Sequence, residues 1–459
     1  MSLRVLHYSD LETALDDPEQ CARLAGAIEA RRDADAVVVG TGDNTAPGAL
    51  SMATRGRIAL PFFEAVAPAA EVFGNHDFDY GPETARELAA ESPMPWLCAN
   101  ARMNGERFAA DATERSRLVE TSGHTVGIVG VSHPETATFN PAAEGVTFHD
   151  PVPPIREAAA RLRERGAKFV IVASHCGPGD ERIARETDVD AVLGGHVHDV
   201  HVETVDGTFV VRPGRAGRYL SEVTLGDGAD VTVHEVTDEH RDPAVASAIG
   251  AELERTGLGE VVAAVDEPIE RSEEAVTVGE SRVGNLVVDA MRWRTDADVA
   301  VSVPGALRSG DPLDGDVTAA ELIGLAPYED DLCVLALSGE RLREVLARIP
   351  LGAHGADYPD RFCGHLSGAS IVFDDETATL REATVGGEPL DLDREYRLAV
   401  ADYVVVTDHV HDVFGPGDVI EEHGQACRAI VDYAREKGIA PEIEGRIERP
   451  TLGRGQSGA

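Results

Sequence analysis

Continuous apolar segments, each ending in polar residues, recur along the first half of the chain. Their hydrophobic residues do not alternate with polar ones, which is typical of strands buried on both faces of a sheet. Between the first two segments, Cys21, Leu24, Ala25 and Ile28 recur at helical spacing and predict one buried helix face. A further helix is expected over residues 155–165, and hairpins within residues 202–236. The predicted strands cover residues 3–8, 36–40, 70–73, 95–99, 125–130, 168–174 and 191–195.

The second half of the chain shows a similar mixture of patterns after an acidic, helical stretch in which Ala246, Ile249, Leu253 and Leu258 form a stripe. Helices and strands then alternate, with a strand over residues 396–406 and a last helix over residues 425–437. A chain of 459 residues suits two large domains. We expect an α/β protein with a first domain over residues 1–240, a helical linker over 241–275, a second domain over 276–450 and a disordered tail over 451–459.

The chain carries 82 acidic and 41 basic residues, a formal net charge of −41. The acidic residues are spread along the chain, so they predict a folded surface of the halophilic type and not a disordered tail. Molar salt screens the resulting self-repulsion within about 3 Å. The same charge disfavours nucleic acid and anionic membranes as partners. An anionic small-molecule substrate would need local positive charge, which metal ions supply.

The setting of the protein is predicted from its cysteines and its apolar runs. The six cysteines are scattered without a close pair, which favours reduced thiols in the cytoplasm. No apolar run reaches the ~18 residues that a membrane helix needs. Residues 3–8 are expected to be a core strand and not part of a signal peptide. The sequence predicts a soluble cytoplasmic protein and leaves its oligomeric state open.

Five of the predicted strands end in a residue that is able to bind a metal: Asp10, Asp43, Asn75, His175 and His196. In open α/β sheets, ligands bind beyond the carboxyl ends of the strands, so we expect these residues to meet at one edge of one sheet. The densest stretch is Gly74–Gly81, whose bracketing glycines let the backbone turn sharply after a short strand. Polar residues also occur in ordinary loops, so the prediction depends on the five strand ends together.

Glu12 and His198 complete a set with enough oxygen and nitrogen ligands for two divalent metal ions. Two ions about 3.5–4 Å apart hold a hydroxide between them and clamp a phosphoryl group. We expect Asp43 to bridge the ions because it follows the more central strand. Glu12 is alternatively only a helix-entry residue. His196 and His198 are separated by one valine, so both rings reach one pocket only if the backbone curls there.

His76 directly follows a predicted ligand and is therefore expected to face the substrate without binding a metal. An imidazole in this position is suited to protonate a leaving alkoxide or to stabilise its developing charge. Asp79, three residues further on, is expected to hold the other ring nitrogen of His76. Asp77 is the rival for that role.

The ordered motifs resemble those of the calcineurin-like metallophosphoesterases, and residues 280–290 resemble the C-terminal domain of the 5′-nucleotidases. The matching motifs are Asp10-x-Glu12, Gly42-Asp43-Asn44, Gly74-Asn75-His76-Asp77-Phe78-Asp79, His175 and Gly195-His196-Val197-His198. The resemblance implies a four-layer α/β/β/α metallophosphoesterase domain followed by a smaller α/β 5′-nucleotidase C-terminal domain that binds the substrate, with the active site in the cleft between them.

The resemblance also implies a role for each matching residue. One metal would be held by Asp10, residue 12, Asp43 and His198, and the other by Asp43, Asn75, His175 and His196. His76 and Asp79 match the family's catalytic dyad, and Arg308 matches a phosphate-binding arginine. Phe362 stands near the first of two aromatic residues that stack on a nucleobase. The second position falls within residues 406–411, which lack aromatic character.

Residue 12 departs from the family, because glutamate stands where histidine is usual. With Asp10 and Asp43 it gives three anionic ligands, which favour Mn²⁺, with Zn²⁺, Mg²⁺ and Fe as alternatives. The sequence therefore predicts a dinuclear-metal, 5′-nucleotidase-like hydrolase of nucleotide catabolism that cleaves a nucleotide or similar phosphomonoester by attack of a metal-bridged hydroxide. One alternative is a phosphodiesterase acting on nucleotide sugars or cyclic nucleotides, or a related thiosulfate-ester hydrolase. Another is a metal-binding protein that has lost its activity.

Overall fold

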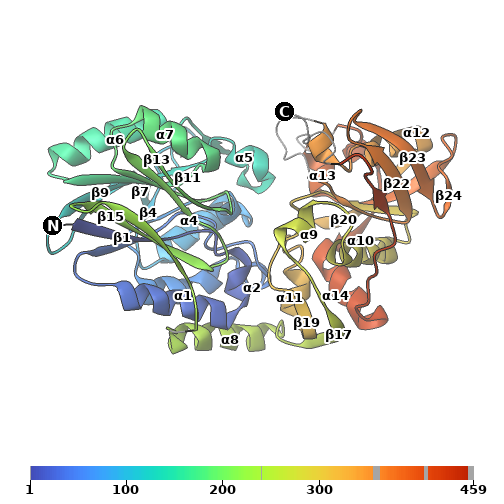
Figure 1. Cartoon of the computed structure of the whole chain (residues 1–459), viewed down its shortest axis with the longest axis horizontal. Coiled ribbons are helices and arrows are strands. Elements are labelled where there is room, and N and C mark those ends of the chain that lie inside the picture. The colour runs from blue at the N-terminus through green and yellow to red at the C-terminus, as the bar shows by residue number, and fades with distance from the viewer. Residues whose placement is uncertain (1, 239, 355–361, 408–411, 453–459) are drawn as a thin grey trace. The chain divides into compact units, whose positions relative to one another are not determined.

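The computed structural model describes residues 2–238, 240–354, 362–407 and 412–452. The chain divides into two compact units, Met1–Thr256 and Gly257–Ala459. Figure 1 colours the first unit from blue to yellow-green and the second from there to red. Among the described residues, no helix combines the length and the apolar character required to cross a bilayer.

The first sheet of the first unit is built around β1 (Ser2–Tyr8), which pairs in parallel with β2 (Ala36–Gly40). On its other side β1 pairs antiparallel with β15 (Tyr219–Gly226), and β16 (Asp230–Glu235) lies at the edge. A parallel bridge from Val39 to Ala70 connects β2 to three short strands. These strands are β3 (Glu71–Val72), β4 (Trp96–Leu97) and β7 (Thr113–Glu114).

The second sheet of this unit has six strands in the order β13-β14-β12-β11-β9-β8. Its centre is parallel, and the strands at both edges are antiparallel to their neighbours. The strands are β13 (Val200–Val205), β14 (Thr208–Pro213), β12 (Ala191–Gly194), β11 (Phe169–His175), β9 (Thr125–Ser132) and β8 (Ser116–Glu120).

A hydrophobic core fills the space between the two sheets, with Val5, Val37 and Val72 from the first sheet against Ile128 and Leu193 from the second. Alternate residues of the second sheet point outward and are covered by α6 (Val152–Glu164) and α7 (Asp180–Glu186). The outer face of the first sheet is covered by α1 (Pro18–Arg31), as Figure 1 shows. The expected four-layer α/β/β/α arrangement is confirmed.

The strand ends differ in one respect from the prediction. Asp10, Asp43 and Asn75 follow strands of the first sheet, whereas His175 and His196 follow strands of the second. The expectation that all five lie at one edge of one sheet is therefore wrong. The buried apolar runs show that both sheet faces are covered, but they do not distinguish one wide sheet from two facing ones.

The expected helical linker over residues 241–275 is also wrong in its second half. Helix α8 (Pro243–Thr256) packs against α1 through Val245 and Ile249 and belongs to the first unit. It is followed by a strand, β17 (Val261–Ile269), which pairs antiparallel with β19 (Leu313–Thr318) in the second unit. The valines of β17 favour a strand, and the partner that makes the strand possible lies about fifty residues further along.

The second unit contains a five-stranded sheet in the order β21-β18-β25-β20-β26. Its strands are β21 (His365–Ser367), β18 (Val299–Ser302), β25 (Glu395–Ala401), β20 (Asp331–Ser338) and β26 (Val419–Gln425). Helix α10 (Arg282–Thr295) packs against β18 and β21 and also against α14 (Ala426–Lys437). A second sheet follows the order β24-β23-β22-β27. These strands are β24 (Glu388–Pro389), β23 (Thr379–Val385), β22 (Ala369–Asp374) and β27 (Ile447–Glu448).

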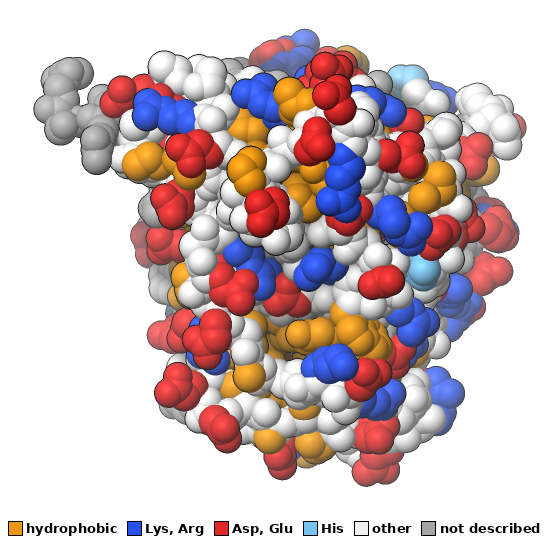
Figure 2. Space-filling view, turned by 90° about the vertical axis from the view of Figure 1, so that its right-hand side faces the viewer, with side chains coloured by type: hydrophobic (Ala, Val, Ile, Leu, Met, Phe, Trp, Pro, Cys, Tyr) orange, Lys and Arg blue, Asp and Glu red, His pale blue; other side chains and the backbone are white. Residues whose placement is uncertain are grey.

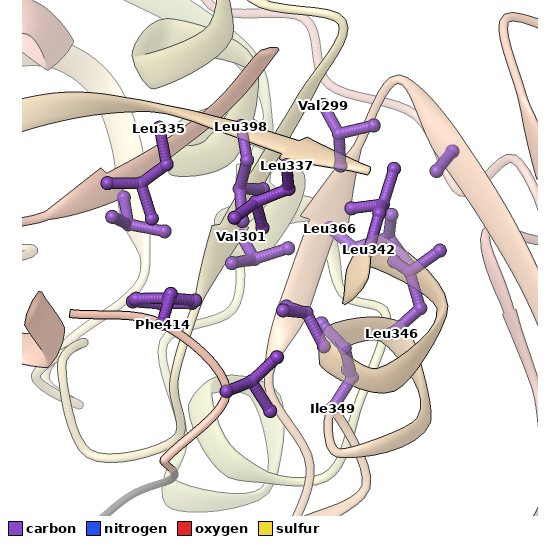
Figure 3. Packing of buried hydrophobic residues seen from close by; sticks show 14 of the residues in the cluster. Val299, Val301, Leu335, Leu337, Leu342, Leu346, Ile349, Leu366, Leu398 and Phe414 are labelled. Carbon is purple, nitrogen blue, oxygen red and sulfur yellow. The ribbon is translucent and has the colours of Figure 1, made fainter. Parts of the chain in front are cut away.

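The core of the second unit lies between its larger sheet and α12 (Gly339–Ala347). Figure 3 shows Leu337 and Leu398 of the sheet and Leu342 and Leu346 of this helix within one cluster of buried side chains. The predicted strand over residues 396–406 is too long. Strand β25 ends at Ala401 and is followed by the short helix α13 (Tyr403–Val406), because this valine-rich end finds no pairing strand among the described residues.

The acidic side chains are distributed over the surface, as expected. Figure 2 shows red acidic groups scattered over one face, with blue arginine and lysine groups between them. Many form ion pairs with arginine, such as Arg57 with Glu87 and Glu91. Residues 453–459 of the expected disordered tail and residues 408–411 of the expected second aromatic position lie outside the described residues.

Candidate active site

The loop after β1 places two carboxylates in unusual backbone conformations. Asp10 has φ 51° and Glu12 has φ 48°, and both side chains are buried. The backbone N–H of Asp10 donates to the carbonyl of Gly42 (3.0 Å), and that of Glu12 donates to the carbonyl of Asp43 (3.2 Å). These bonds hold the loops after β1 and β2 against each other. Left-handed backbone is costly for residues other than glycine and concentrates at functional sites.

Asp43 stands at the centre of the group, because it contacts both sheets. One carboxylate oxygen accepts the backbone N–H of His76 (2.7 Å), and the other lies 3.0 Å from His175 Nε2. The backbone that follows β3 approaches the Asp43 carboxylate closely at Gly74. A Cβ atom on Gly74 would lie 2.1 Å from Asp43 Oδ1, so only glycine fits there. Gly74 has no left-handed backbone, and its role is close approach and not the sharp turn that we expected.

The ends of β11 and β12 complete this side of the group. His175 Nδ1 donates to the carbonyl of Thr41 (2.6 Å), which directs Nε2 toward Asp43. His196 Nδ1 lies 2.8 Å from the side-chain oxygen of Asn75. The backbone N–H of His196 donates to Asp10 Oδ1 (3.1 Å). His196 has φ 74°. This is the backbone curl that the His-Val-His motif requires for both rings to reach one site.

His198 joins the two carboxylates of the β1 loop. Its Nε2 is 3.2 Å from Glu12 Oε1 and 3.7 Å from Asp10 Oδ1. Arg215, which we did not single out from the sequence, donates from Nη1 to His198 Nδ1 (3.1 Å) and lies 3.7 Å from Glu12 Oε2. Arg215 follows β14, so the strand-end rule would have found it if applied to cations as well as to metal ligands.

The donor set fits divalent metal ions. Among the described residues, Asp43, His175 and His196 bring one ligand atom each within 4.8 Å of one another, and so do Asp10, Glu12 and His198. Burial raises the pKa of Asp10 to about 6 despite the nearby His175 and His198. Burial disfavours the charged forms of both Asp43 and His175, yet their mutual attraction prevails and lowers the pKa of Asp43 while raising that of His175. Several buried carboxylates at one point favour cations between them.

His76 and Asp79 form a direct pair. His76 Nδ1 lies 3.1 Å from Asp79 Oδ1 and 3.2 Å from Oδ2. The rival Asp77 is used elsewhere: its carboxylate accepts the backbone N–H groups of Gly74 (2.7 Å) and Asp43 (2.9 Å). The geometry therefore favours Asp79 as the partner of His76 and makes Asp77 an anchor of the loop.

Three further residues in contact with the predicted site residues did not emerge from the sequence. Asn140 donates from Nδ2 to Asp79 Oδ1 and to the backbone carbonyl of Asn75, both at 2.7 Å. The rings of His133 and Phe139 stack on His196 with centroids 5.2 and 5.4 Å away. His133 directly follows β9, so the strand-end rule covers it. Phe139 ends the short helix α5 (Thr136–Phe139) and Asn140 follows it, and the sequence of this segment gives no such signal.

Glu71 is a further buried carboxyl group that the sequence pattern concealed within an apolar run. It accepts hydrogen bonds from the backbone N–H of Gly42 (3.1 Å), from Tyr8 Oη (3.0 Å) and from Asn44 Nδ2 (3.2 Å). Burial, helped by the charge of Asp77, raises the pKa of Glu71 to about 8. Through its hydrogen bonds to Gly42, Tyr8 and Asn44, Glu71 holds the loop that carries Asp43 against β1 and β3.

The predicted substrate residues lie in the second unit. Arg308 is buried, and its guanidinium stands 5.5 Å from the ring centroid of Tyr328. Phe362 is half-buried, and its carbonyl accepts the N–H of Gly352 (2.9 Å). Tyr328 and Tyr403 line a mainly apolar pocket of this unit together with Val287, Met291 and Val303. Aromatic residues make up only 5% of the chain, so a tyrosine that follows a strand is a candidate for binding an aromatic substrate group. The prediction of residues 396–406 as one strand concealed that Tyr403 follows the end of β25.

Comparison with known proteins identifies the domain families of the two units. The family model of the calcineurin-like phosphoesterases matches residues 3–200, and that of the 5′-nucleotidase C-terminal domain matches residues 261–414. A trifunctional nucleotide phosphoesterase of Bacillus subtilis (strain 168) is 22% identical over 98% of this chain, which spans only 35% of that relative's length.

Two solved structures share the fold. A 5′-nucleotidase precursor of Thermus thermophilus superposes with a TM-score of 0.84, at 22% identity, over 98% of this chain and 99% of its own. A sulfate thiohydrolase of Thermus thermophilus gives 0.76, at 21% identity, over 98% and 96%.

The first unit is thus a phosphoesterase domain of the calcineurin-like class, whose members use dinuclear metal centres. With its C-terminal domain, the chain belongs to the 5′-nucleotidase family. Members of both families are hydrolytic phosphoesterases, which confirms the expected class of enzyme.

Proposed function

We propose that the protein is a dinuclear-metal phosphohydrolase that releases phosphate from a nucleotide or a similar phosphomonoester. The observation that carries this proposal is the meeting of five strand ends from two sheets around Asp43, whose two carboxylate oxygens contact different sides of the site. The net charge of −41 makes an uncompensated acidic cluster a poor receptor for a phosphate ester. Bound cations would reverse that local charge.

We assign the ligands from the two clusters. The first ion would be held by Asp10, Glu12, Asp43 and His198, and the second by Asp43, Asn75, His175 and His196. The oxygen-rich first set favours Mn²⁺. Two bound ions would polarise the phosphoryl oxygens and lower the pKa of a water molecule.

The residues of the chain contribute the remaining steps. The Asp79 carboxylate holds His76 through Nδ1, and we assign to His76 Nε2 the proton that the leaving alkoxide takes up. Arg308 would bind the phosphate through its planar guanidinium, and Phe362 would contact the base or another apolar part of the substrate. The pocket beside Tyr328 and Tyr403 supports a substrate with an aromatic group.

Hydrolysis of a chromogenic phosphomonoester in molar salt with Mn²⁺ tests the proposal. Asn75→Ala and His76→Ala should each lower kcat at least about a hundredfold, because one removes a ligand and the other the proton donor. His149→Ala is the matched control, since His149 is exposed and belongs to none of the ligand clusters among the described residues. Full activity in both site variants would contradict the proposal.

A substrate panel separates the alternatives. Nucleoside monophosphates should be hydrolysed faster than cyclic nucleotides, nucleotide sugars or thiosulfate esters. The reverse order would support a phosphodiesterase or the thiohydrolase chemistry of the structural relative with that name. Bound Mn²⁺ in elemental analysis without turnover of any of these compounds would support a metal-binding protein that has lost its activity.

We also propose that the protein works in a reducing compartment, namely the cytoplasm. All six cysteines lie among the described residues, and each is buried as a free thiol. Burial raises the pKa of Cys21, Cys98 and Cys176 well above the ordinary value, which makes these thiols unreactive. Fractionation of the native cells would test the compartment.

A further inference from the structure

Two histidines, one from each ligand cluster, differ in what their outer ring nitrogens contact. His175 Nδ1 faces a backbone carbonyl, that of Thr41, at 2.6 Å. His198 Nδ1 faces the guanidinium of Arg215, whose Nη1 lies 3.1 Å away. A carbonyl accepts a proton in a hydrogen bond, whereas a guanidinium only donates. The two rings are therefore held in opposite tautomers.

This difference matters for metal binding. A histidine binds a metal through a ring nitrogen that carries no proton, and a neutral ring then keeps its proton on the other nitrogen. Such rings almost always donate that proton to a carboxylate, a carbonyl or water. His175 already satisfies this arrangement, with its proton on Nδ1 and Nε2 directed at Asp43. It needs no rearrangement before it binds.

His198 is in the opposite state. Because Nδ1 accepts from Arg215, the ring proton sits on Nε2, which is the nitrogen that faces Glu12 Oε1 at 3.2 Å. Metal binding through Nε2 requires the loss of that proton and the gain of one at Nδ1, where it would meet the N–H of Arg215. Arg215 must then release His198. Glu12 Oε2, 3.7 Å from Arg215 Nη1, is the carboxylate oxygen to which it would turn.

The backbone holds Arg215 in this place. Its loop follows β14 and contains three left-handed residues in a row of four, Gly214, Ala216 and Gly217, with φ 79°, 56° and 63°. The N–H of Ala216 donates to the backbone carbonyl of Asp10 (2.8 Å). The loop is thus fixed to the same segment that carries the metal ligand Asp10. The Arg215 side chain is only 13% exposed, so solvent competes weakly for it.

We propose that Arg215 is a positioning residue that makes the two metal sites unequal, so that the Asp10–Glu12–His198 site binds its ion more weakly and exchanges it faster than the Asp43–His175–His196 site. This inference rests on the proposed dinuclear function. It adds that loading is sequential, with the ion of the Asp10–Glu12–His198 site entering last and only when Arg215 moves from His198 to Glu12.

A titration of the metal-free full-length protein with Mn²⁺ in molar KCl tests the inference, because molar salt screens general charge effects. Calorimetry should give two steps that differ at least tenfold in Kd. Arg215→Gln should tighten the weaker step about tenfold, since its amide oxygen accepts the His198 proton. Arg215→Met removes the charge without supplying an acceptor and should tighten it less, and Arg215→Lys should stay within about threefold of the wild type. Arg23→Gln, which removes an arginine from a partly exposed ion pair with Asp238, is the control for net charge and should change neither step.

Nitrogen-15 spectra of the metal-free wild type give a second test that needs no variant. They should show the proton of His198 on Nε2, and a proton on Nδ1 would overturn the inference. Equal affinities for both ions in the wild type, or an unchanged weaker step in Arg215→Gln, would also overturn it while leaving the proposed function intact. Absence of any Mn²⁺ binding by the wild type would contradict the proposed function itself.

Discussion

At the scale of single residues, backbone conformation at the site is as distinctive as side-chain identity. Asp10, Glu12, Asp43 and His196 all have positive φ, a conformation that L-residues other than asparagine, aspartate and histidine rarely adopt. Glu12 is the least suited of the four. Each such residue costs of order 1–3 kcal/mol, and it persists because surrounding hydrogen bonds fix it. The backbone of the site is therefore organised before any ligand arrives.

A prediction at this scale concerns Asn140, which bonds both Asp79 and the carbonyl of Asn75. Asn140→Ala should lower kcat about tenfold and leave KM within about threefold, because Asp79 would then orient His76 less well. It should also displace the limb of the pH–rate profile that His76 governs. Steady-state kinetics across pH, with a melting curve to confirm the fold, measure both effects. An unchanged profile would show that Asn140 has no part in positioning the dyad.

At the scale of elements, the site depends on how closely loops from different strands approach. Gly74 and Gly195 are two points of close approach: a Cβ atom would lie 2.1 Å from Asp43 Oδ1 at the first and 2.3 Å from Ser9 Oγ at the second. The rigid strands β3 and β12 carry these glycines to their places. Sites supported on strands are held more precisely than sites on long loops.

Gly74→Ala should abolish Mn²⁺ binding and activity, because the methyl group displaces the bridging carboxylate of Asp43. Gly166→Ala is the matched control. Gly166 has φ 95° and open space around it, so the substitution should cost about 1 kcal/mol of stability and leave activity intact. Metal analysis, kinetics and thermal melting of the two variants provide the comparison. Normal metal binding in Gly74→Ala would mean that the loop relaxes around the added methyl group.

At the scale of the whole molecule, charge dominates the behaviour expected in solution. Exposed ion pairs such as Arg57 with Glu91 each contribute little and weaken with salt. The net charge of −41 acts in the other direction, because salt screens the repulsion among the excess acidic residues. The excess of acidic residues is large and is spread over the surface. The screening of their repulsion should therefore outweigh the weakening of the ion pairs.

Raising KCl from about 0.1 M to about 1 M should therefore raise the thermal midpoint, as the screening length falls from about 10 Å to about 3 Å. The measurement is a series of melting curves in KCl, with an uncharged osmolyte as the control for general surface exclusion. A midpoint that falls with KCl would show that ion pairs outweigh the net repulsion.

The sequence by itself determined the buried strands, the amphipathic helices and the residues at the strand ends. Strands β1, β2, β11 and β12 and the residues that follow them agree with the apolar runs, because burial on both faces leaves a continuous hydrophobic signal. The resemblance of the ordered motifs correctly gave the four layers and both domain families.

Only the tertiary structure decided which groups meet. Asn140, Arg215 and Glu71 contact partners such as Asp79, Glu12 and Gly42, which lie 61, 203 and 29 residues away along the chain, and no local pattern encodes such contacts. The same applies to the division of the strand ends between two sheets and to the pairing of β17 with β19. Periodicity records whether a residue is buried, whereas the identity of its neighbours depends on how distant strands pack together.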